Sequence, residues 1–256
     1  MVDFSGQTVL ITGGNKGLGA GVARAVAAAG AEVTLVGLEP DVAEVAAAWS
    51  REFGRPLHGI TADIALPEDV ARLAAQAPAL DVLINNAGLE LITPIEDPDP
   101  EVDARFRRIV EINVIGTFAV TRALLPKIRE GGRIVNTASM WGKTAVAEFS
   151  AYCASKHAVI GLTRSLAQEL APRRISVNAV CPGWVRTEAS MRSLSAMAAR
   201  SGRSEEGLLA EIVDAQALPG LMEPADMADI YLFLASHAAR NITGQAFTVD
   251  RGELMQ

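Results

Sequence analysis

The stretch Thr8-Val9-Leu10-Ile11-Thr12-Gly13-Gly14-Asn15-Lys16-Gly17-Leu18-Gly19 decides the fold of this chain. A short apolar strand is expected at residues 7–11, and the Ala/Val-rich residues 20–29 after the stretch predict a helix. A glycine-rich turn between a strand and a helix is typical of a phosphate-binding site. The reason is that free backbone N–H groups at the helix N-terminus attract an anion.

Three of the four glycines in this motif have separate expected roles. Gly13 would permit the tight turn, Gly17 would let a pyrophosphate approach the backbone, and Gly19 would let the helix pack closely on the sheet. A flexible loop ahead of a surface helix is the competing interpretation. The strand–turn–helix context favours the phosphate site.

The same alternation of strands and helices continues along the chain. Uninterrupted runs of Val, Leu and Ile in the strands indicate a parallel sheet covered on both faces. No linker, repeat or change of composition divides the sequence, so we expect one α/β domain over residues 1–256 with about seven strands. The further strands are expected at 32–37, 57–60, 81–84, 133–138, 175–180 and 246–249, with a turn at 131–132. The further helices are expected at 41–53, 67–76, 101–130, 150–170 and 224–236, with two more in the segment 187–220. A break around Pro126 is expected in the helix at 101–130.

Composition excludes several classes of function. The net charge is −7 and the isoelectric point about 5.1, which argues against a nucleic-acid partner. The two cysteines, Cys153 and Cys181, and the three scattered histidines have no metal-ligand spacing, so no metal site is expected. Residues 1–6 lack the features of a signal peptide, and no uncharged apolar run approaches the ~20 residues of a membrane helix. We therefore expect a cytoplasmic protein without a membrane partner.

A second stretch, from Ser139 to Lys156, carries candidate catalytic groups. Tyr152 and Lys156 stand four residues apart in a helical pattern and so project from one helix face, while Ser139 closes an apolar strand. A phenol has a reference pKa near ~10, and a cation one turn away should lower that pKa. Such a phenol is suited to general acid–base catalysis. A solvated lysine beside a tyrosine ring is the competing interpretation.

Other unusual residues also follow predicted strands at their carboxyl ends. Ligands of parallel α/β sheets bind at this edge, so a single ligand could touch all of these residues. They lie at 12–19, 37–39, 63, 85–88, 139 and 182–187.

Taken together, these motifs resemble those of the short-chain dehydrogenase/reductase family, in its main single-domain branch. The matching residues are T-G-G-N-K-G-L-G at 12–19, N-N-A-G at 85–88, Asn113, Ser139, Y-C-A-S-K at 152–156, and P-G at 182–183. The resemblance covers essentially the whole chain, and the order and spacing of the six motifs make chance agreement very unlikely. It implies a Rossmann-type doubly wound sheet that binds NAD or NADP.

The resemblance also implies residue roles. Tyr152 would be the general acid/base, Lys156 would tune its pKa and bind the nicotinamide ribose, Ser139 would hydrogen-bond the substrate oxygen, and Asn113 would hold a water of a proton relay. Further cofactor contacts are implied for Gly13, Asn15, Lys16, Gly17, Leu18, Gly19, Leu38, Asp63, Ile64, Asn86, Ala87, Gly88, Pro182, Gly183, Val185 and Thr187. Asp63 as a helix N-terminal acid is the competing interpretation for that residue.

The choice between NAD and NADP depends on the end of the second strand. Family members that select NAD often carry Asp where this chain has Gly37, and those that select NADP often carry Arg where it has Leu38. Lys16 would favour the 2′-phosphate of NADP, whereas Glu39 would repel it. We expect NAD, because no arginine provides a fork for a phosphate, and NADP is not excluded.

The resemblance implies hydride transfer between the cofactor and a secondary alcohol or ketone. Trp141 and Trp184 beside Ser139 and Tyr152, with a flap at about 187–220, suggest a cyclic, aromatic or otherwise apolar substrate, unless these residues serve packing alone. A 3-oxoacyl or hydroxy-acid enzyme of the same fold is an alternative. A nucleotide sensor without catalysis ranks lower, because the four catalytic residues are present. The family also implies a homotetramer, formed through the helices around 113–125 and 150–170.

Overall fold

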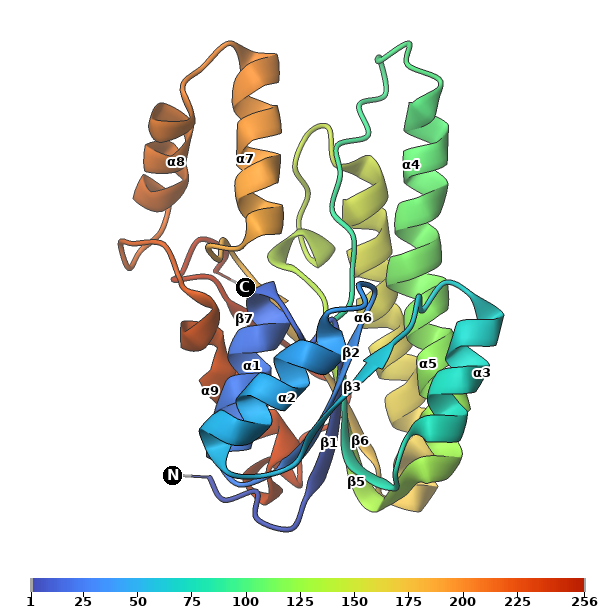
Figure 1. Ribbon diagram of the computed structural model, residues 1–256. Helices are drawn as coiled ribbons and strands as arrows, with labels where there is room; N and C mark the ends of the chain where they lie inside the picture. Colours follow the sequence, from blue (N-terminus) through green and yellow to red (C-terminus); the bar gives the residue numbers. More distant parts are fainter. Residues whose placement is uncertain (1, 256) are drawn as a thin grey trace.

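A parallel sheet of seven strands forms the centre of the computed structural model, which describes residues 2–255 (Figure 1). Residues 1 and 256 of the expected domain lie outside the described part. The strand order is β3-β2-β1-β4-β5-β6-β7, with the crossover between β3 and β4 that a doubly wound sheet requires. The strands are β1 Thr8–Thr12, β2 Glu32–Gly37, β3 Leu57–Thr61, β4 Leu80–Asn85, β5 Ile128–Thr137, β6 Ser176–Pro182 and β7 Ala246–Val249.

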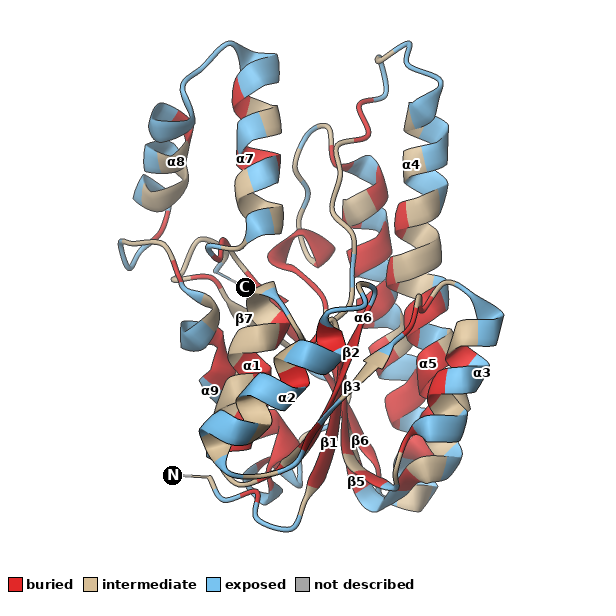
Figure 2. Cartoon of the chain, in the orientation of Figure 1, coloured by how far each residue is buried: buried red, intermediate tan, exposed pale blue. Residues whose placement is uncertain are grey.

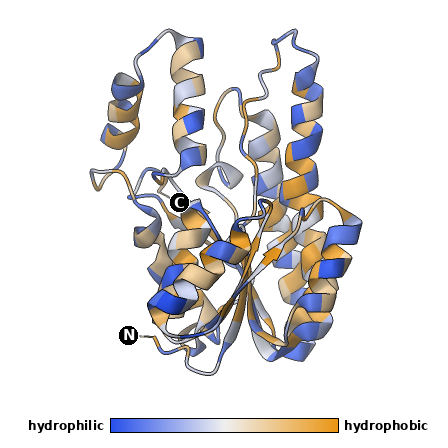
Figure 3. Cartoon of the chain, viewed as in Figure 1, coloured by the Kyte–Doolittle hydropathy of each residue, from blue (hydrophilic) through white to orange (hydrophobic). Residues whose placement is uncertain are grey.

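Helices cover both faces of this sheet, as the apolar strands predict. Side chains that alternate along β1 enter different cores: Val9 and Ile11 pack with α1, α2 and α9, whereas Leu10 packs with α3, α5 and α6. Figures 2 and 3 show the buried, apolar strands between helices whose outer sides are exposed and hydrophilic. The helices are α1 Gly17–Ala28, α2 Val42–Phe53, α3 Pro67–Gln76, α4 Glu101–Val110, α5 Thr117–Leu124, α6 Ser150–Leu170, α7 Glu188–Ser201, α8 Glu205–Asp214 and α9 Ala228–Ala235.

The helix expected at 101–130 has the predicted break around Pro126: it passes into a 3₁₀ turn at Leu125–Lys127 and ends at Lys127 instead of Glu130. The sequence did not predict the π-helical segment, Glu111–Gly116, that separates α4 from α5. The expected turn at 131–132 is instead an irregularity inside β5, where the pairing with β4 shifts register. Gly131 accommodates it with a φ of 74°.

The continuous helix Glu101–Lys127 is long and apolar enough to cross a membrane by length and composition alone. In the fold it covers the sheet together with α3 and α6, and Val120 and Leu124 are buried in the core. Packing within the domain thus accounts for part of its apolar surface, while Phe106, Ile115 and Phe118 stay exposed.

The two helices α7 and α8 stand beyond the carboxyl ends of the strands (Figure 1). A separate apolar cluster joins them to the body, where Leu194 and Leu208 pack with Trp141, Phe149 and Trp184. Two helices in this segment agree with the sequence prediction. The last predicted helix, 224–236, is divided into a 3₁₀ turn, Pro224–Met227, and α9.

Candidate active site

A cleft of about 470 Å³ runs along the carboxyl ends of the strands. The predicted site residues line it with two exceptions, Gly19 and Asn113, which lie directly behind its wall. The predicted positions that the cleft brings together are Gly13, Asn15, Lys16, Gly17, Leu18, Leu38, Asp63, Ile64, Asn86, Ala87, Gly88, Ser139, Trp141, Tyr152, Lys156, Pro182, Gly183, Trp184, Val185 and Thr187.

The glycine-rich turn forms one end of the cleft. Gly13 and Gly17 have φ values of 62° and 54°, which favour glycine, and the N-cap residue Lys16 makes no side-chain capping bond. The first N–H groups of α1 therefore remain available to an anion. Gly19 was predicted to let the helix pack closely on the sheet, but its closest neighbour is the turn. A Cβ at Gly19 would lie 2.0 Å from the Gly13 carbonyl oxygen, so this glycine lets α1 approach the glycine-rich turn.

Hydrogen bonds hold the turn against the end of β4. The backbone N–H groups of Asn86 and Ala87 donate to the Thr12 hydroxyl at 3.0 and 3.1 Å, and the Asn86 amide donates to the Gly13 carbonyl at 3.1 Å. The N-N-A-G segment thereby fixes the shape of the phosphate-binding turn.

At the other end of the cleft, a hydroxyl, a phenol and an ammonium group meet. The Ser139 hydroxyl and the Tyr152 phenol both line this end, and the Trp141 N–H donates to the Ser139 hydroxyl at 3.2 Å. The Lys156 ammonium lies 5.5 Å from the centre of the Tyr152 ring and donates to the Thr137 carbonyl at 2.8 Å. We call this group, Ser139, Tyr152 and Lys156, the reacting corner.

The pKa of Tyr152 contradicts the sequence prediction. Burial, and then the negative charge of Glu90, raise the pKa of the phenol above its ordinary value, whereas the hydrogen bond from Ser139 lowers it. Lys156 does not reverse the shift, since burial lowers its own pKa to about 8 and its ammonium group lies over the ring face. The phenol is therefore held in its proton-donating form.

Asn113 lies in the π-helical segment and is buried. Its amide group donates to the Leu89 carbonyl and to the Ser155 hydroxyl, both at 2.9 Å, and its side-chain oxygen accepts from the Leu89 N–H at 2.7 Å. The side chain thus fixes the loop after β4 and the helix of Tyr152.

Asp63 has structural partners in addition to its place in the cleft wall. Its carboxylate accepts from the Ala65 N–H at 2.9 Å and pairs with Arg108 at 2.6 Å. The structure thus fits both interpretations of this residue, the ligand contact and the local structural role.

The end of β2 has a geometry that the sequence did not predict. A Cβ at Gly37 would lie 2.7 Å from the Asn15 side chain, so this glycine leaves room for Asn15. Lys16 pairs with Glu39 at 2.5 Å across the cleft end, and this hydrogen bond lowers the pKa of Glu39. The two opposing charges of this region therefore neutralise each other.

Glu90 is the main residue of the site that sequence reasoning missed. It lines the cleft together with Tyr152 and Lys156, and it faces the charges of Lys156 and Arg192. Burial raises its pKa. The available signal was an acid placed two residues after N-N-A-G, where the chain leaves the end of β4.

An aromatic group forms the wall beside the reacting corner. The Trp141 ring lies 5.7 Å from the Trp184 ring and 6.0 Å from the Tyr152 ring, both edge to face, and 5.1 Å from Phe149. Trp141 and Trp184 also line the cleft, though each is largely buried. They serve packing and offer an apolar surface to a ligand.

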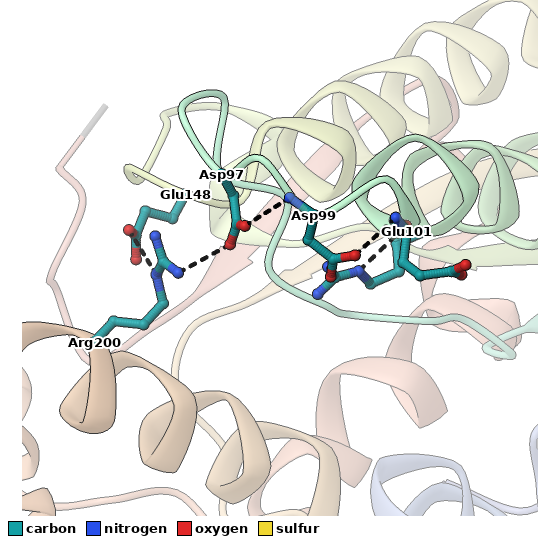
Figure 4. Close-up of polar contacts among 6 residues, drawn as sticks. Asp97, Asp99, Glu101, Glu148 and Arg200 are labelled. Carbon is teal, nitrogen blue, oxygen red and sulfur yellow. Dashed lines mark hydrogen bonds and ion pairs between the residues drawn. The ribbon is translucent and has the colours of Figure 1, made fainter.

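Arg200 connects α7 to two loops near the cleft (Figure 4). Its guanidinium donates to Glu148 at 2.8 Å and to Asp97 at 3.1 Å, and Asp97 accepts from the Asp99 N–H at 3.1 Å. These contacts join the segment 187–220 to the loops that follow β4 and β5.

Comparison with known proteins agrees with this geometry. A family model described as enoyl-(acyl carrier protein) reductase matches residues 13–253. D-beta-hydroxybutyrate dehydrogenase of Cupriavidus necator is 36% identical over 260 residues, which cover 99% of this chain and 100% of the relative. The chain belongs to the short-chain dehydrogenase/reductase family.

The names of two further relatives give substrates other than hydroxybutyrate. The 2-(S)-hydroxypropyl-CoM dehydrogenase 3 of Xanthobacter autotrophicus is 34% identical over 252 residues, covering 96% of each chain. L-sorbose reductase from Gluconobacter frateurii, solved with NADPH and L-sorbose, has a TM-score of 0.88 at 27% identity, covering 100% of this chain and 99% of its own. As a short-chain dehydrogenase/reductase, this chain is an NAD(P)-dependent oxidoreductase of secondary alcohols or their ketones.

Proposed function

We propose that Ser139, Tyr152 and Lys156 catalyse hydride transfer between a nicotinamide cofactor and a cyclic, aromatic or otherwise apolar secondary alcohol or ketone. The convergence of these three groups in one cleft supports the proposal most directly. When bound, the nicotinamide ring supplies or accepts the hydride. Ser139 orients the substrate oxygen, and Tyr152 gives a proton to it in reduction or takes one from it in oxidation.

The test is turnover measured by NAD(P)H absorbance with a panel of cyclic and open-chain ketones and alcohols. Cofactor binding without turnover on any member would favour the sensor interpretation. A hydroxy-acid substrate is the second candidate, because a D-beta-hydroxybutyrate dehydrogenase is a relative of full length. The edge-to-face tryptophans beside Tyr152 favour the apolar class over it.

The cofactor is proposed to be NAD, because a 2′-phosphate beside Glu39 would compete for Lys16 with a carboxylate already paired to it. Leu38→Arg should add a guanidinium fork for that phosphate and raise the ratio of kcat/KM for NADP over NAD by about ten- to a hundredfold. Leu66→Arg, also at an exposed leucine but outside the cleft, is the control. A wild type that prefers NADP, and loses that preference in Lys16→Ala, would show that Lys16 controls this end of the cleft.

We also propose a homotetramer in the cytoplasm. Large apolar side chains are exposed on the helix of 101–127, at Phe106, Ile115 and Phe118 with 40%, 47% and 44% exposure, and this helix packs beside α6. The two buried, unpaired cysteines suit a reducing compartment.

Light scattering at micromolar concentration should give four times the chain mass of 26.9 kDa. Phe118→Asp should lower this mass, because it places a charge in an apolar contact between copies. Leu66→Asp, at another exposed apolar position, should leave it unchanged. A wild-type mass near that of one chain would contradict the proposal.

A further inference from the structure

Thr93, in the loop after β4, is buried against the start of α6, the helix that carries Tyr152. This helix begins at Ser150, and its own N-cap residue, Phe149, makes no side-chain capping bond. The first N–H groups of a helix have no partner within the helix, and a polar side chain at the N-cap usually accepts from one of them. The start of α6 therefore has to find its cap elsewhere in the chain.

The hydroxyl of Thr93 supplies this cap from the other loop. It accepts a hydrogen bond at 3.1 Å from the N–H of Ala151, the residue directly before Tyr152. The Ser150 hydroxyl donates to the Thr93 carbonyl at 3.1 Å, and the two hydroxyl oxygens lie 3.1 Å apart. Since the Ser150 proton is used for the carbonyl, the Thr93 hydroxyl is the donor within this pair. Each hydroxyl thus both donates and accepts, although the two residues are 57 positions apart in the chain.

The backbone just before α6 is fixed by the same residue. Glu148 has a φ of 69°, a left-handed conformation that is strained for a residue other than glycine. Its carbonyl accepts from the Thr93 N–H at 2.6 Å. Its carboxylate accepts from Arg200 on α7, which also contacts Asp97 in the loop of Thr93 (Figure 4). The strained turn is thus held from two sides, so a movement of the loop would be transmitted to the start of α6.

The other side of this helical turn is fixed from the body of the fold. The Ser155 hydroxyl donates to the Tyr152 carbonyl at 2.8 Å and accepts from the buried Asn113 side chain at 2.9 Å. Asn113 therefore holds the C-terminal side of Tyr152, and Thr93 holds its N-terminal side. Tyr152 lies between these two restraints and lines the cleft.

We propose that Thr93 is a positioning residue for the reaction: its hydroxyl caps α6 and thereby sets where the Tyr152 phenol meets the substrate oxygen. The inference rests on the proposed function, in which Tyr152 transfers the proton. Thr93 acts through the helix, since it lies outside the lining of the cleft. A displacement of about 1 Å at a reacting group can cost about a hundredfold in rate, so the loss of the cap should appear in kcat.

The test is Thr93→Val, which removes the hydroxyl and keeps the branched shape and both backbone contacts of Thr93. With an alcohol or ketone that the wild type turns over, kcat should fall about tenfold, and single-turnover kinetics should show the same loss in the chemical step. The Kd for NADH should stay within about twofold, because the cleft lining is unchanged. Thr93→Ser keeps the hydroxyl and should bring kcat back to within about twofold of wild type.

A matched control lies further along the same helix. Thr163 is also buried, and its hydroxyl donates to the Val159 carbonyl at 2.8 Å and accepts from the Asn136 amide at 2.9 Å. Thr163→Val removes an equal hydroxyl and should lower the Tm, while kcat stays within about twofold of wild type. If both valine variants lose kcat equally, the effect is one of general stability and the role of Thr93 is wrong.

The possible results separate this inference from the proposed function. A folded Thr93→Val variant with the kcat of wild type would overturn the role of Thr93 and leave hydride transfer in place. If Thr93→Val does not fold, Ser150→Ala removes the donor to the Thr93 carbonyl: kcat should then fall about threefold, and an unchanged kcat would contradict the role. Cofactor binding by wild type without turnover of any alcohol or ketone in the panel would overturn the proposed function, and this inference with it.

Discussion

Replacing Tyr152 by Phe is expected to lower kcat by about 10³-fold, because the variant loses the proton donor of the reacting corner. The ring itself should remain in place, since it packs edge to face on Trp141 and lies under the Lys156 ammonium. The Kd for NADH, measured by fluorescence titration, should therefore change by less than about threefold. Single-turnover kinetics would assign the loss to the chemical step.

The chain offers a matched control for this experiment. Tyr231 is the only other tyrosine of the sequence; it is fully buried, and its hydroxyl is 2.8 Å from the Thr137 hydroxyl and outside the cleft lining. Tyr231→Phe removes an equal atom and should cost about 1 kcal/mol of stability with little change in kcat. Substantial turnover by Tyr152→Phe would show that another group supplies the proton.

Local sequence patterns predicted most of the fold. Strands such as Glu32–Gly37 and helices such as Pro67–Gln76 have the predicted ends, because uninterrupted apolar runs and an N-terminal proline are local signals. The predicted start of β5, at residue 133, was wrong by five residues, because the strand begins at Ile128. Its register shift against β4 depends on tertiary pairing, and the pair Gly131-Gly132 looks like an ordinary turn in the sequence.

The sequence predicted which residues form the site, but it predicted their pKa shifts less well. The motifs placed Ser139, Tyr152 and Lys156 at one edge of the sheet, since strand ends and helix periodicity fix those positions. The sign of the Tyr152 pKa shift was wrong, because burial and Glu90 outweigh a lysine that is itself desolvated. Neither burial nor the approach of Glu90 from another loop can be read from spacing along the chain.

Gly19→Ala is expected to reduce cofactor affinity by about a hundredfold, because the new methyl group has no space. A Cβ at this position would lie 2.0 Å from the Gly13 carbonyl oxygen and 2.5 Å from the Asn86 side-chain nitrogen. A backbone carbonyl cannot turn away as a flexible side chain can, so α1 and the turn must move apart by about 1 Å. Fluorescence titration with NADH measures the loss, and thermal unfolding should show a lower Tm.

The displacement also breaks the contact that shapes the turn. Asn86 donates to the same Gly13 carbonyl, and its N–H is tied to Thr12, so a shift at Gly19 is transmitted to both sides of the phosphate site. Ala28→Ser adds one atom at an exposed position of the same helix and should leave the affinity unchanged. Since Gly19 lies behind the cleft and lines none of it, normal affinity in Gly19→Ala would mean that the phosphate contacts do not depend on the distance between helix and turn.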